Sequence, residues 1–594
     1  MDRRAFLRLT GFFTVSSAAA GLAACSDDDN ATPAEPAGRY VFSEGVASGD
    51  PRATSLVFWT RASRATGTDD VALRLEVAGD DKFGSIVARA SLTAQSKYDF
   101  TVRHKVTGLV AGTRYWYRFV AGSDTSAVGR ARTAPAADSS PAQLRFGWFT
   151  CQDWTVNHWQ AMALMAAEDF DFVVHLGDYI YETIGQDFQA GAAEPAHTAL
   201  AFPDGTTLGS GKYATTVADY RSLYRRYRGD ARLQTVHASF PAIVIWDDHE
   251  FTDDAWQDHQ TYTNANVEQL ARRRAATQAW AEYMPVDWSD VAFDLDAAGF
   301  QNIRIYRSFE FGKLMTLVMT DERLYRDDHP VNEAQYAALT GADPVDGNSS
   351  IGARYFVPRT TLAAFEANAT TALGRAPQIL GPTQTQWWKD TMKSSAATWK
   401  VWGNEVTLNR MWLDLTASAP APYNQVFVVN GDVWDGYPTH KAELLGFLRD
   451  NAVKNVVAIT GDLHAFQAGV VRDDNTPAGT AVLCDFVSAG ISSGSMYSYF
   501  AAGGSSGPLA PLVATPATFD GVIRANNPDF AYVDHDAQGY ASATVTADSF
   551  KVTFTKVAKL NADGTAPALA SAVAKTTSFT VTAGTTAISV DGTD

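Results

Sequence analysis

Residues Phe170 to Glu182 read F-D-F-V-V-H-L-G-D-Y-I-Y-E and carry the pattern that recurs through the chain. A short apolar run ends at Gly177, and Asp178 and Tyr181 follow directly. This pattern predicts a buried strand that ends in a tight turn and presents a carboxylate and a phenol at the rim of a sheet. Glycine and aspartate after a strand are common turn residues, so one such stretch identifies no site by itself.

The same arrangement recurs at three other places in the chain. Apolar runs lead into Thr150-Cys151-Gln152-Asp153, into Asp247-Asp248-His249-Glu250 and into Gly461-Asp462-Leu463-His464. In open α/β sheets, ligands bind beyond the carboxyl ends of the strands. We therefore expect the residues after these four runs to form one shared metal site.

The chemistry of the candidate ligands indicates two unlike metals. The candidates are Cys151, Asp178, Tyr181, Asp248, Asp462 and His464. Carboxylates suit Ca²⁺, Mg²⁺ or Mn²⁺, whereas a thiolate and a phenolate favour an iron-class metal. Two sites that share the Asp178 carboxylate would accommodate this mixed set. The chain has no GxxxxGK[ST] loop, which argues against nucleoside-triphosphate machinery.

Length and composition set the outer limits. The chain has 594 residues, so two or more domains are expected. A net charge of −18 argues against a general nucleic-acid-binding role. After the N-terminus, no apolar run approaches the ~20 residues of a membrane-spanning helix.

The N-terminal segment is predicted to be an export signal. Residues 1–25 resemble a twin-arginine signal, with Arg3-Arg4 followed by an apolar stretch. The end of this segment, Leu22-Ala23-Ala24-Cys25, resembles a lipobox, which predicts lipid modification of Cys25; the alternative is an ordinary signal-peptidase site with an incidental cysteine. Residues 26–38, rich in Asp and Pro, are expected to be a disordered tether.

Only two other cysteines are present, Cys151 and Cys484. One disulfide between them is possible, and an odd free thiol is equally possible. Cys151 follows a predicted strand and is better placed as a ligand, whereas Cys484 lies in an apolar run and is expected in the core.

Two structural parts are expected after the tether. Residues 39–136 contain β-rich runs at 54–60, 71–77 and 115–119, which predict a small all-β domain of fibronectin or immunoglobulin type. Residues 137–594 alternate apolar strands with helical segments, which predicts a largely parallel, layered α/β domain. The stretches 187–216 and 327–382 lack periodicity and are expected to be insertions that wall a pocket.

Ordered motifs over nearly the whole predicted mature chain resemble the PhoD-type alkaline phosphatases, a branch of the calcineurin-like metallophosphoesterases. They include 42–51, Phe58-Trp59-Thr60-Arg61, the stretches around Asp178, Asp248 and Asp462, Trp399-Lys400-Val401-Trp402-Gly403-Asn404, and 527–540. The resemblance implies a β-sandwich flanked by helices that hydrolyses phosphate monoesters with a metal-bound hydroxide.

The resemblance also implies roles for individual residues. Cys151, Asp178, Tyr181 and His464 would bind Fe³⁺, and Asp178, Asp248 and Asp462 would bind Ca²⁺. A second Ca²⁺ is implied without assigned ligands. His249 would stabilise the transition state or protonate the leaving oxygen, although it could instead bind metal. Asp247 could replace Asp248 as a ligand.

Several alternatives stay open at this level. A phosphodiesterase or phospholipase D acting on phospholipids or teichoic acids would use the same metals, and a non-catalytic surface lipoprotein is a second alternative. We expect export by the twin-arginine translocase to the periplasm or cell surface, with a lipid anchor at Cys25 or as a secreted protein, and a monomer.

A few residues depart from the family pattern or have a plain structural explanation. Glu322 and Glu405 replace the usual small residue and Gln, which puts the preference for anionic substrates in doubt. His175 is expected to be a buried core histidine. The basic run 221–228 could bind phosphate but is more typical of a solvated helix face.

Overall fold

The computed structural model describes residues 38–593 except 187–188, 190, 262–265, 341–351, 477 and 505–509. The predicted export segment with Cys25, and the predicted tether up to residue 37, lie outside the described residues. No helix in the described part of the chain combines the length and the apolar character needed to cross a membrane.

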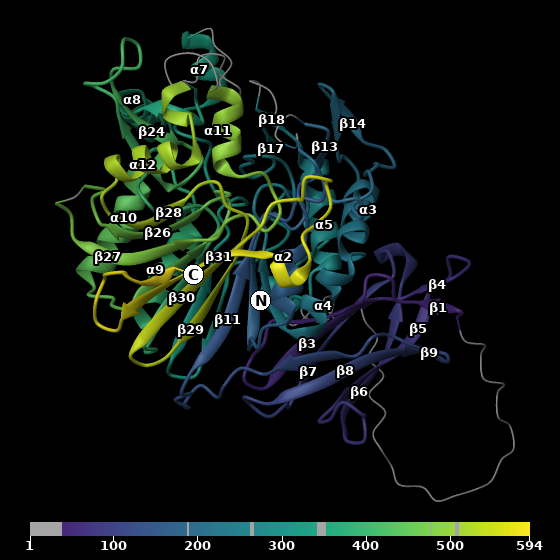
Figure 1. Ribbon diagram of the computed structural model, residues 1–594. Helices are drawn as coiled ribbons and strands as arrows, with labels where there is room; N and C mark the ends of the chain where they lie inside the picture. Colours follow the sequence, from purple (N-terminus) through teal and green to yellow (C-terminus); the bar gives the residue numbers. More distant parts are fainter. Residues whose placement is uncertain are drawn as a thin grey trace, which may run out of the picture.

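Two large mixed sheets form the centre of the molecule (Figure 1). The ten-stranded sheet contains, from edge to edge, β32 (Ser589–Thr593), β31 (Val573–Thr582), β30 (Ser549–Val557), β29 (Gly539–Val545), β11 (Leu144–Phe149), β12 (Phe172–Leu176), β16 (Pro241–Ile245), β2 (Val46–Gly49), β3 (Ser55–Arg61) and β7 (Thr101–Thr107). The seven-stranded sheet contains β19 (Arg307–Phe311), β20 (Met315–Met319), β22 (Trp399–Asn404), β25 (Val456–Thr460), β27 (Ala481–Val487), β26 (Phe466–Arg472) and β28 (Phe530–Asp534).

Parallel pairing is confined to the middle of each sheet. Strands β11, β12, β16 and β2 are parallel neighbours, as are β20, β22, β25 and β27. Both edges of each sheet pair antiparallel, so the expectation of a largely parallel domain is wrong for the edges. The C-terminal strands after residue 539 cause much of this difference, because they return as hairpins beside β11.

The largest apolar core lies between the two sheets. Phe172 of β12 stacks on Phe311 of β19 with ring centroids 4.4 Å apart, and Phe146 of β11 stacks on Phe172 at 4.9 Å. Alternate residues of both sheets join this cluster. The two sheets therefore form a sandwich, and the ends of their strands are held in fixed positions relative to one another.

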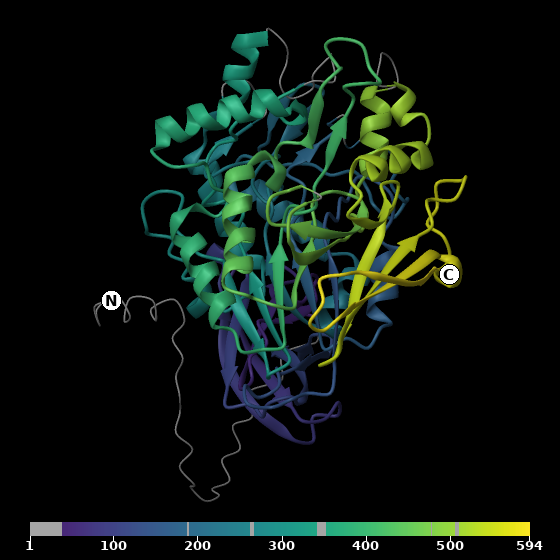
Figure 2. The same ribbon diagram turned by 90° about the vertical axis from the view of Figure 1, so that its left-hand side faces the viewer.

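Helices cover the outer faces of the sandwich (Figures 1 and 2). The ten-stranded sheet is covered by α2 (Gln160–Ala166), α3 (Val217–Arg228), α4 (Ala231–Ser239) and α5 (Leu270–Tyr283). The seven-stranded sheet is covered by α9 (Gly381–Ser394) and α10 (Pro438–Asp450), whose apolar residues pack on Val318, Trp402 and Val456. The predicted β-sandwich flanked by helices is confirmed.

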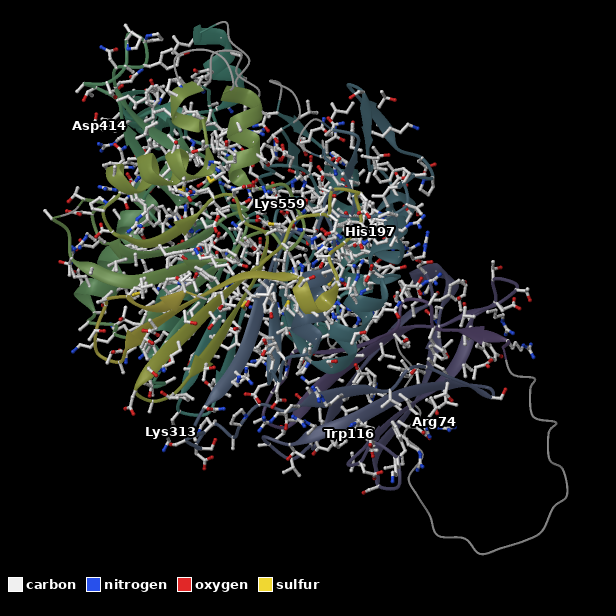
Figure 3. All side chains as sticks on the ribbon, viewed as in Figure 1. Arg74, Trp116, His197, Lys313, Asp414 and Lys559 are labelled. Atoms are coloured by element: carbon white, nitrogen blue, oxygen red, sulfur yellow. The ribbon has the colours of Figure 1, made fainter. Side chains whose placement is uncertain are left out.

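The N-terminal all-β part shares a sheet with the rest of the chain. Its second sheet is built from β5 (Val71–Ala78), β6 (Ile86–Ala94), β8 (Arg114–Ala121), β9 (Asp124–Thr125) and β10 (Gly129–Arg132). This sheet packs on β3 and β7, for example through Phe58 and Tyr117, whose ring centroids are 4.7 Å apart. Figure 3 places Arg74 and Trp116 on it, far from Asp414. Because β16 pairs with β2, the division at residue 136 stays a prediction.

The two stretches without sequence periodicity carry short elements. The first contains β14 (Thr206–Leu208) and β15 (Gly211–Tyr213), which pair with each other; β15 also pairs with β13 (Thr183–Ile184). The second contains α7 (Glu333–Thr340), β21 (Tyr355–Pro358) and α8 (Arg359–Leu373). Strand β21 pairs with β24 (Val426–Asn430), which also pairs with β23 (Trp412–Asp414). The strand before Asp432 therefore lies outside both large sheets.

Candidate metal centre

The four predicted strand ends come together at one edge of the sandwich. Cys151 follows β11, Asp178 follows β12, Asp247 and Asp248 follow β16, and Asp462 and His464 follow β25. The first two loops are joined through their backbones, because the Cys151 amide donates to the Gly177 carbonyl at 3.2 Å and the Gln152 amide donates to the Asp178 carbonyl at 3.0 Å. Each sheet thus contributes ligand candidates to the same place.

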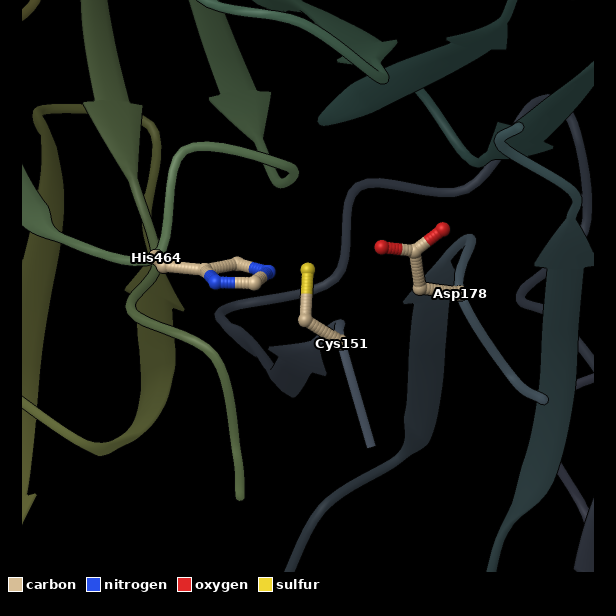
Figure 4. Close-up of side chains that lie close together, drawn as sticks. All are labelled: Cys151, Asp178 and His464. Atoms are coloured by element: carbon tan, nitrogen blue, oxygen red, sulfur yellow. The ribbon is translucent and has the colours of Figure 1, made fainter. Parts of the chain in front are cut away.

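One cluster contains the soft and the strongly donating groups. Ligand atoms of Cys151, Asp178 and His464 lie within 4.8 Å of one another. Figure 4 shows the Cys151 sulfur between the imidazole and the carboxylate. The Tyr181 hydroxyl lies 3.1 Å from Asp178 Oδ2 and 3.1 Å from His464 Nε2. The four residues predicted to bind one metal are therefore adjacent in space.

A second cluster adjoins the first and is built from carboxylates. Ligand atoms of Asp247, Asp248 and Asp462 lie within 4.8 Å of one another. Ligand atoms of Asp178, Asp248 and His249 also lie within 4.8 Å of one another, so this group overlaps the second cluster at Asp248. The sequence left Asp247 and Asp248 as alternatives, and the structure brings both to the cluster. Asp178 belongs to the first cluster and to the overlapping group, which is the position expected of a shared ligand.

A third acidic group extends from Asp248. Ligand atoms of Asp248, Asp253 and Asp254 also lie within 4.8 Å of one another. The Asp254 amide donates to Asp248 Oδ2 at 2.5 Å, which orients that carboxylate. The second cation that the resemblance implied had no ligands assigned; this group is a candidate for it, and Arg354 Nη1 already pairs with Asp254 at 2.7 Å and with Asp253 at 3.4 Å.

The loops hold several of these residues in an unusual backbone conformation. Cys151, Asp178, Asp462 and His464 have φ angles of 56°, 57°, 60° and 56°. Such left-handed conformations are uncommon for residues with a side chain and persist where the surrounding structure enforces them. Gly177 (φ 101°) is required beside them, because an added Cβ would lie 2.4 Å from the Asp247 amide nitrogen.

The buried carboxylate of Glu250 holds the loops after β12 and β16. It accepts hydrogen bonds from the backbone amides of Asp178 at 3.0 Å, Tyr179 at 2.7 Å and Asp247 at 2.8 Å. A single side chain therefore fixes two adjacent ligand loops. Sequence reasoning missed this residue, although it stands in the same acidic run as Asp248.

Two buried carboxylate oxygens in the clusters fit a bound cation. Asp178 Oδ1 and Asp247 Oδ2 are buried, and neither has a hydrogen-bond partner among the described residues. Burial, together with the neighbouring carboxylates, raises the pKa of Asp178 and of Asp462 well above the usual range of an aspartate. Burial and the charge of Asp178 also raise the pKa of the Cys151 thiol. Buried anionic donors in this arrangement are compensated when they coordinate metal.

His249 is held against the clusters by a second buried acid. Its Nδ1 lies 2.7 Å from Glu182 Oε2, and its ring lies 4.2 Å from the Tyr181 ring between centroids. Burial alone would lower the pKa of His249, but the carboxylates of Asp248, Glu182 and Asp178 raise it well above its usual range. Glu182 thus orients the imidazole, and sequence reasoning gave it no role.

Arg323 is a further residue that the sequence pattern did not single out. Its buried guanidinium pairs with Asp247, donates through Nη1 to Asp432 Oδ2 at 2.8 Å, and places Nη2 3.8 Å from Asp462 Oδ1. Nη2 itself has no hydrogen-bond partner among the described residues. The fully buried guanidinium therefore joins Asp247 to Asp432 and offsets part of the negative charge of the carboxylate cluster.

Three other expectations from the sequence concern a disulfide, a buried histidine and the basic run 221–228. Cys151 and Cys484 are both free thiols, so the disulfide alternative is wrong. His175 is buried as expected and accepts from the Gly177 amide at 3.1 Å. The basic run on α3 is not a solvated face, because Arg221 pairs with Glu282, Arg225 pairs with Asp99, and Arg228 lies 4.0 Å above the Trp59 ring.

The two departing carboxylates face each other in the interior. Glu405 accepts a hydrogen bond from the Glu322 amide, and Glu322 Oε2 accepts one from the Val406 amide at 2.9 Å. Burial raises the pKa of Glu322 to about 8 and that of Glu405 well above its usual range. Both favour the neutral acid, so the expected repulsion of anionic substrates does not follow from them.

Fold and site together define an α/β sandwich protein with adjoining clusters of possible metal ligands at the strand ends. Comparison with known proteins assigns the family. The chain matches the PhoD-like phosphatase model over residues 146–554 and the model of the PhoD-like phosphatase N-terminal domain over residues 27–135. The chain belongs to the PhoD-like phosphatase family and is a hydrolase of phosphoric esters.

Individual relatives agree with this assignment over most of the chain. Alkaline phosphatase D of Bacillus subtilis (strain 168) is 29% identical over 563 residues, which cover 93% of this chain and 84% of that protein. A solved structure of PhoD is similar with a TM-score of 0.73 and 27% sequence identity, covering 93% of this chain and 92% of that one.

Proposed function

We propose that this phosphoesterase depends on metal and hydrolyses phosphate monoesters outside the cytoplasmic membrane. The observation that carries the proposal is the pair of adjoining clusters with buried, unpartnered carboxylate oxygens on Asp178 and Asp247. Membership of the family supports ester hydrolysis as the reaction. The clustering of so many anionic side chains in one buried place argues against a non-catalytic lipoprotein.

The donor types assign a different metal to each cluster. Cys151, Tyr181, Asp178 and His464 would hold Fe³⁺, because thiolate, phenolate and imidazole suit an iron-class ion. Asp178, Asp248 and Asp462 would hold Ca²⁺, which prefers oxygen ligands. Asp247 adjoins this group, but its Oδ1 is paired with Arg323, so we place it second among the calcium ligands. A second Ca²⁺ would bind at the group formed by Asp248, Asp253 and Asp254.

The residues of the chain would act on the ester as follows. Two cations held by these clusters would polarise phosphoryl oxygens and supply an activated water. Arg323 would hold the Asp247 and Asp432 carboxylates in place beside the clusters. His249, fixed by Glu182, would donate a proton to the leaving oxygen. No nucleophilic side chain is required by this scheme, so no covalent phosphoenzyme would form.

Diester hydrolysis, including a phospholipase D activity, is the second candidate. The supporting observation is a pair of aromatic side chains near the centre. Tyr499 on α11 (Met496–Gly504) lies with its ring 6.2 Å from the His464 ring, and Tyr499 and Tyr355 are 39% and 40% exposed. These partly exposed rings would contact the second ester-linked group of a phosphodiester.

Metal content and turnover test the proposal together. We expect about one iron per chain, a visible phenolate-to-iron absorption, and Ca²⁺-dependent hydrolysis of a phosphomonoester that a chelator abolishes. Tyr181→Phe should remove the absorption. Tyr179→Phe is the matched control, because its hydroxyl contacts His237 at 2.7 Å instead of the cluster. A colourless, iron-free protein that hydrolyses neither a monoester nor a diester would contradict the metal assignment. The monoester-to-diester rate ratio decides between the two activities.

Export and anchoring are tested separately. We propose twin-arginine export and lipid modification at Cys25, on the strength of the Arg3-Arg4 pair and the sequence Leu22-Ala23-Ala24-Cys25. Cys25→Ala should shift the protein from the membrane fraction to the soluble exported fraction, and Arg3→Lys with Arg4→Lys should retain it inside the cell. Equal membrane association of the wild type and Cys25→Ala would contradict the lipid anchor.

A further inference from the structure

A second group of metal-ligating side chains lies outside the candidate centre, where helix α7 begins. Ligand atoms of Asp328, His329 and Glu333 lie within 4.8 Å of one another. His329 is 4% exposed and Glu333 is fully buried. None of these residues belongs to the strand-end loops that form the main centre.

Two buried atoms in this group lack partners in the part of the chain that the structure describes. They are Nδ1 of His329 and Oε2 of Glu333. The other imidazole nitrogen is already engaged, because His329 Nε2 lies 2.6 Å from Asp432 Oδ1. Nδ1 is therefore the nitrogen available to a ligand, and it lies 3.7 Å from Asp328 Oδ1.

The surroundings resemble those of a metal-binding histidine. A carboxylate that accepts from the distal ring nitrogen is the usual partner of such a histidine, because it fixes the tautomer and raises the basicity of the ligating nitrogen. Asp432 occupies that position. The Asp328 carboxylate is oriented by the His329 amide at 2.8 Å and by Asn266 Nδ2 at 3.2 Å, and the other oxygen of Glu333 accepts from Arg354 Nε at 3.1 Å.

We propose that Asp328, His329 and Glu333 bind a divalent first-row transition cation, with Zn²⁺ as the best match. One imidazole and two carboxylates provide three protein ligands, and water would complete a tetrahedral site. A hard ion such as Ca²⁺ would be a poor match, because it takes six or more oxygen ligands. The proposal does not depend on the iron and calcium assignments above.

The site is connected to the candidate centre through one carboxylate. Asp432 accepts from His329 and also from Arg323 Nη1 at 2.8 Å and Arg326 Nη1 at 3.0 Å. The cation would hold the His329 ring and thereby the Asp432 carboxylate against Arg323. We infer a stabilising role for the site, since it would fasten the segment before α7 to a residue beside the clusters.

A proton is the competing occupant of this position. Burial lowers the pKa of His329, but the Asp328 and Asp432 carboxylates beside its two ring nitrogens raise it to about 9. A histidinium surrounded by carboxylates would account for the same geometry without a metal. The experiment must therefore separate bound Zn²⁺ from a buried ion pair.

Zn²⁺ binding to the full-length protein, purified with its other metals retained, makes this distinction. We compare the wild type with His329→Gln, Glu333→Gln and the control His104→Gln, a half-buried histidine on β7. Equilibrium dialysis against buffered Zn²⁺ should give one additional equivalent in the wild type and the control. In the two cluster variants the affinity for this equivalent should fall at least about tenfold. Zn²⁺ should raise the Tm of the wild type but not of either variant.

Zinc-edge X-ray absorption gives a second readout that does not depend on variant stability. The wild type should show a first shell of about four nitrogen and oxygen atoms with outer-shell scattering from one imidazole. Equal Zn²⁺ binding by the wild type and both variants, or no zinc equivalent in the wild type, would overturn the proposal and leave His329 as a buried histidinium.

Discussion

The main centre and the group at α7 are both built from carboxylates and imidazole, but they are assembled in different ways. The main centre collects residues that follow four buried strands, whereas the group at α7 lies within six consecutive residues, 328–333, in a loop and the first turn of a helix. The first depends on the packing of two sheets, and the second depends on local backbone and one shared partner, Asp432.

This difference predicts how far the effect of a substitution extends from each group. A change at the main centre should disturb residues from both sheets, because Asp178 and Asp248 each belong to more than one group of candidate ligands. A change at α7 should remain local unless it reaches Asp432. Site-directed substitutions test that contrast.

Asp178→Asn should have the largest effect. Asp178 is the residue common to the thiolate cluster and the Asp248–His249 group, so the substitution removes one charge from both. We expect kcat/KM for a phosphomonoester to fall on the order of 10³-fold or more, with loss of both metals. Elemental analysis beside steady-state kinetics measures both.

Asp50→Asn is the matched control for this substitution. Asp50 is also a buried aspartate, but it pairs with Arg307 at 2.7 Å, away from the clusters. It should lower stability without changing the metal content or the activity per folded molecule. Retention of iron and calcium by Asp178→Asn would contradict the idea that the two metals share this ligand.

Gly177→Ala should follow in size. The new methyl group would meet Asp247 at 2.4 Å in a backbone of φ 101°, so it would displace a ligand loop as well as strain the backbone. We expect about 2–4 kcal/mol of destabilisation, measured by urea unfolding, together with reduced metal content.

Gly209→Ala separates the two contributions to that effect. Gly209 also has a positive φ of 55°, but an added Cβ would meet nothing within 4 Å. It should cost about 1 kcal/mol and leave metal content unchanged. Equal effects of the two substitutions would mean that Gly177 matters only for its backbone conformation.

Glu182→Gln should lower activity without removing metal. The amide keeps the shape of the side chain but loses the charge that faces His249 Nδ1 at 2.7 Å. We expect kcat to fall about 10²-fold with KM and metal content nearly unchanged. Glu194→Gln, which alters a buried glutamate paired with Arg232 at 2.7 Å, should leave kcat unchanged. A loss of metal in Glu182→Gln would show a structural role instead.

A pH-dependent effect on stability alone is expected away from both metal groups, at His440 of α10. Burial lowers the pKa of His440 to about 3, from an ordinary value near 6.5. The unfolded chain therefore takes up a proton first as the pH falls, and stability is lost from pH 6.5 downwards. His440 should account for about 2–3 kcal/mol of the stability lost between pH 7 and pH 4.5. Urea unfolding of His440→Asn should show a correspondingly flatter pH dependence across that interval.

The strand-end pattern explains why the fold, and the meeting of these residues at one edge of the sandwich, could be predicted from the sequence. The runs before Cys151, Asp178, Asp247 and Asp462 became β11, β12, β16 and β25. Continuous apolar runs are typical of strands buried on both faces, and the residues after them meet at one edge when the strands are parallel.

The rest could not be predicted, because it depends on contacts between distant segments. Glu250 and Glu182 act through backbone and imidazole partners that no local spacing reveals, and Arg323 acquires its role from Asp247 and Asp432. The segment that contains Asp328, His329 and Glu333 has no hydrophobic periodicity, so its structure could not be predicted from the sequence. The pairing of β2 with β16 could not be predicted either, because it joins residues nearly two hundred positions apart.

Anomalous X-ray diffraction from crystals of the protein as purified is the decisive test of the two-cluster centre, because it locates each metal by element. We expect an iron peak bounded by Cys151, Asp178, Tyr181 and His464, with calcium density beside Asp248 and Asp462. An absence of iron at Cys151, or a single metal held without Asp178, would contradict the two-cluster centre.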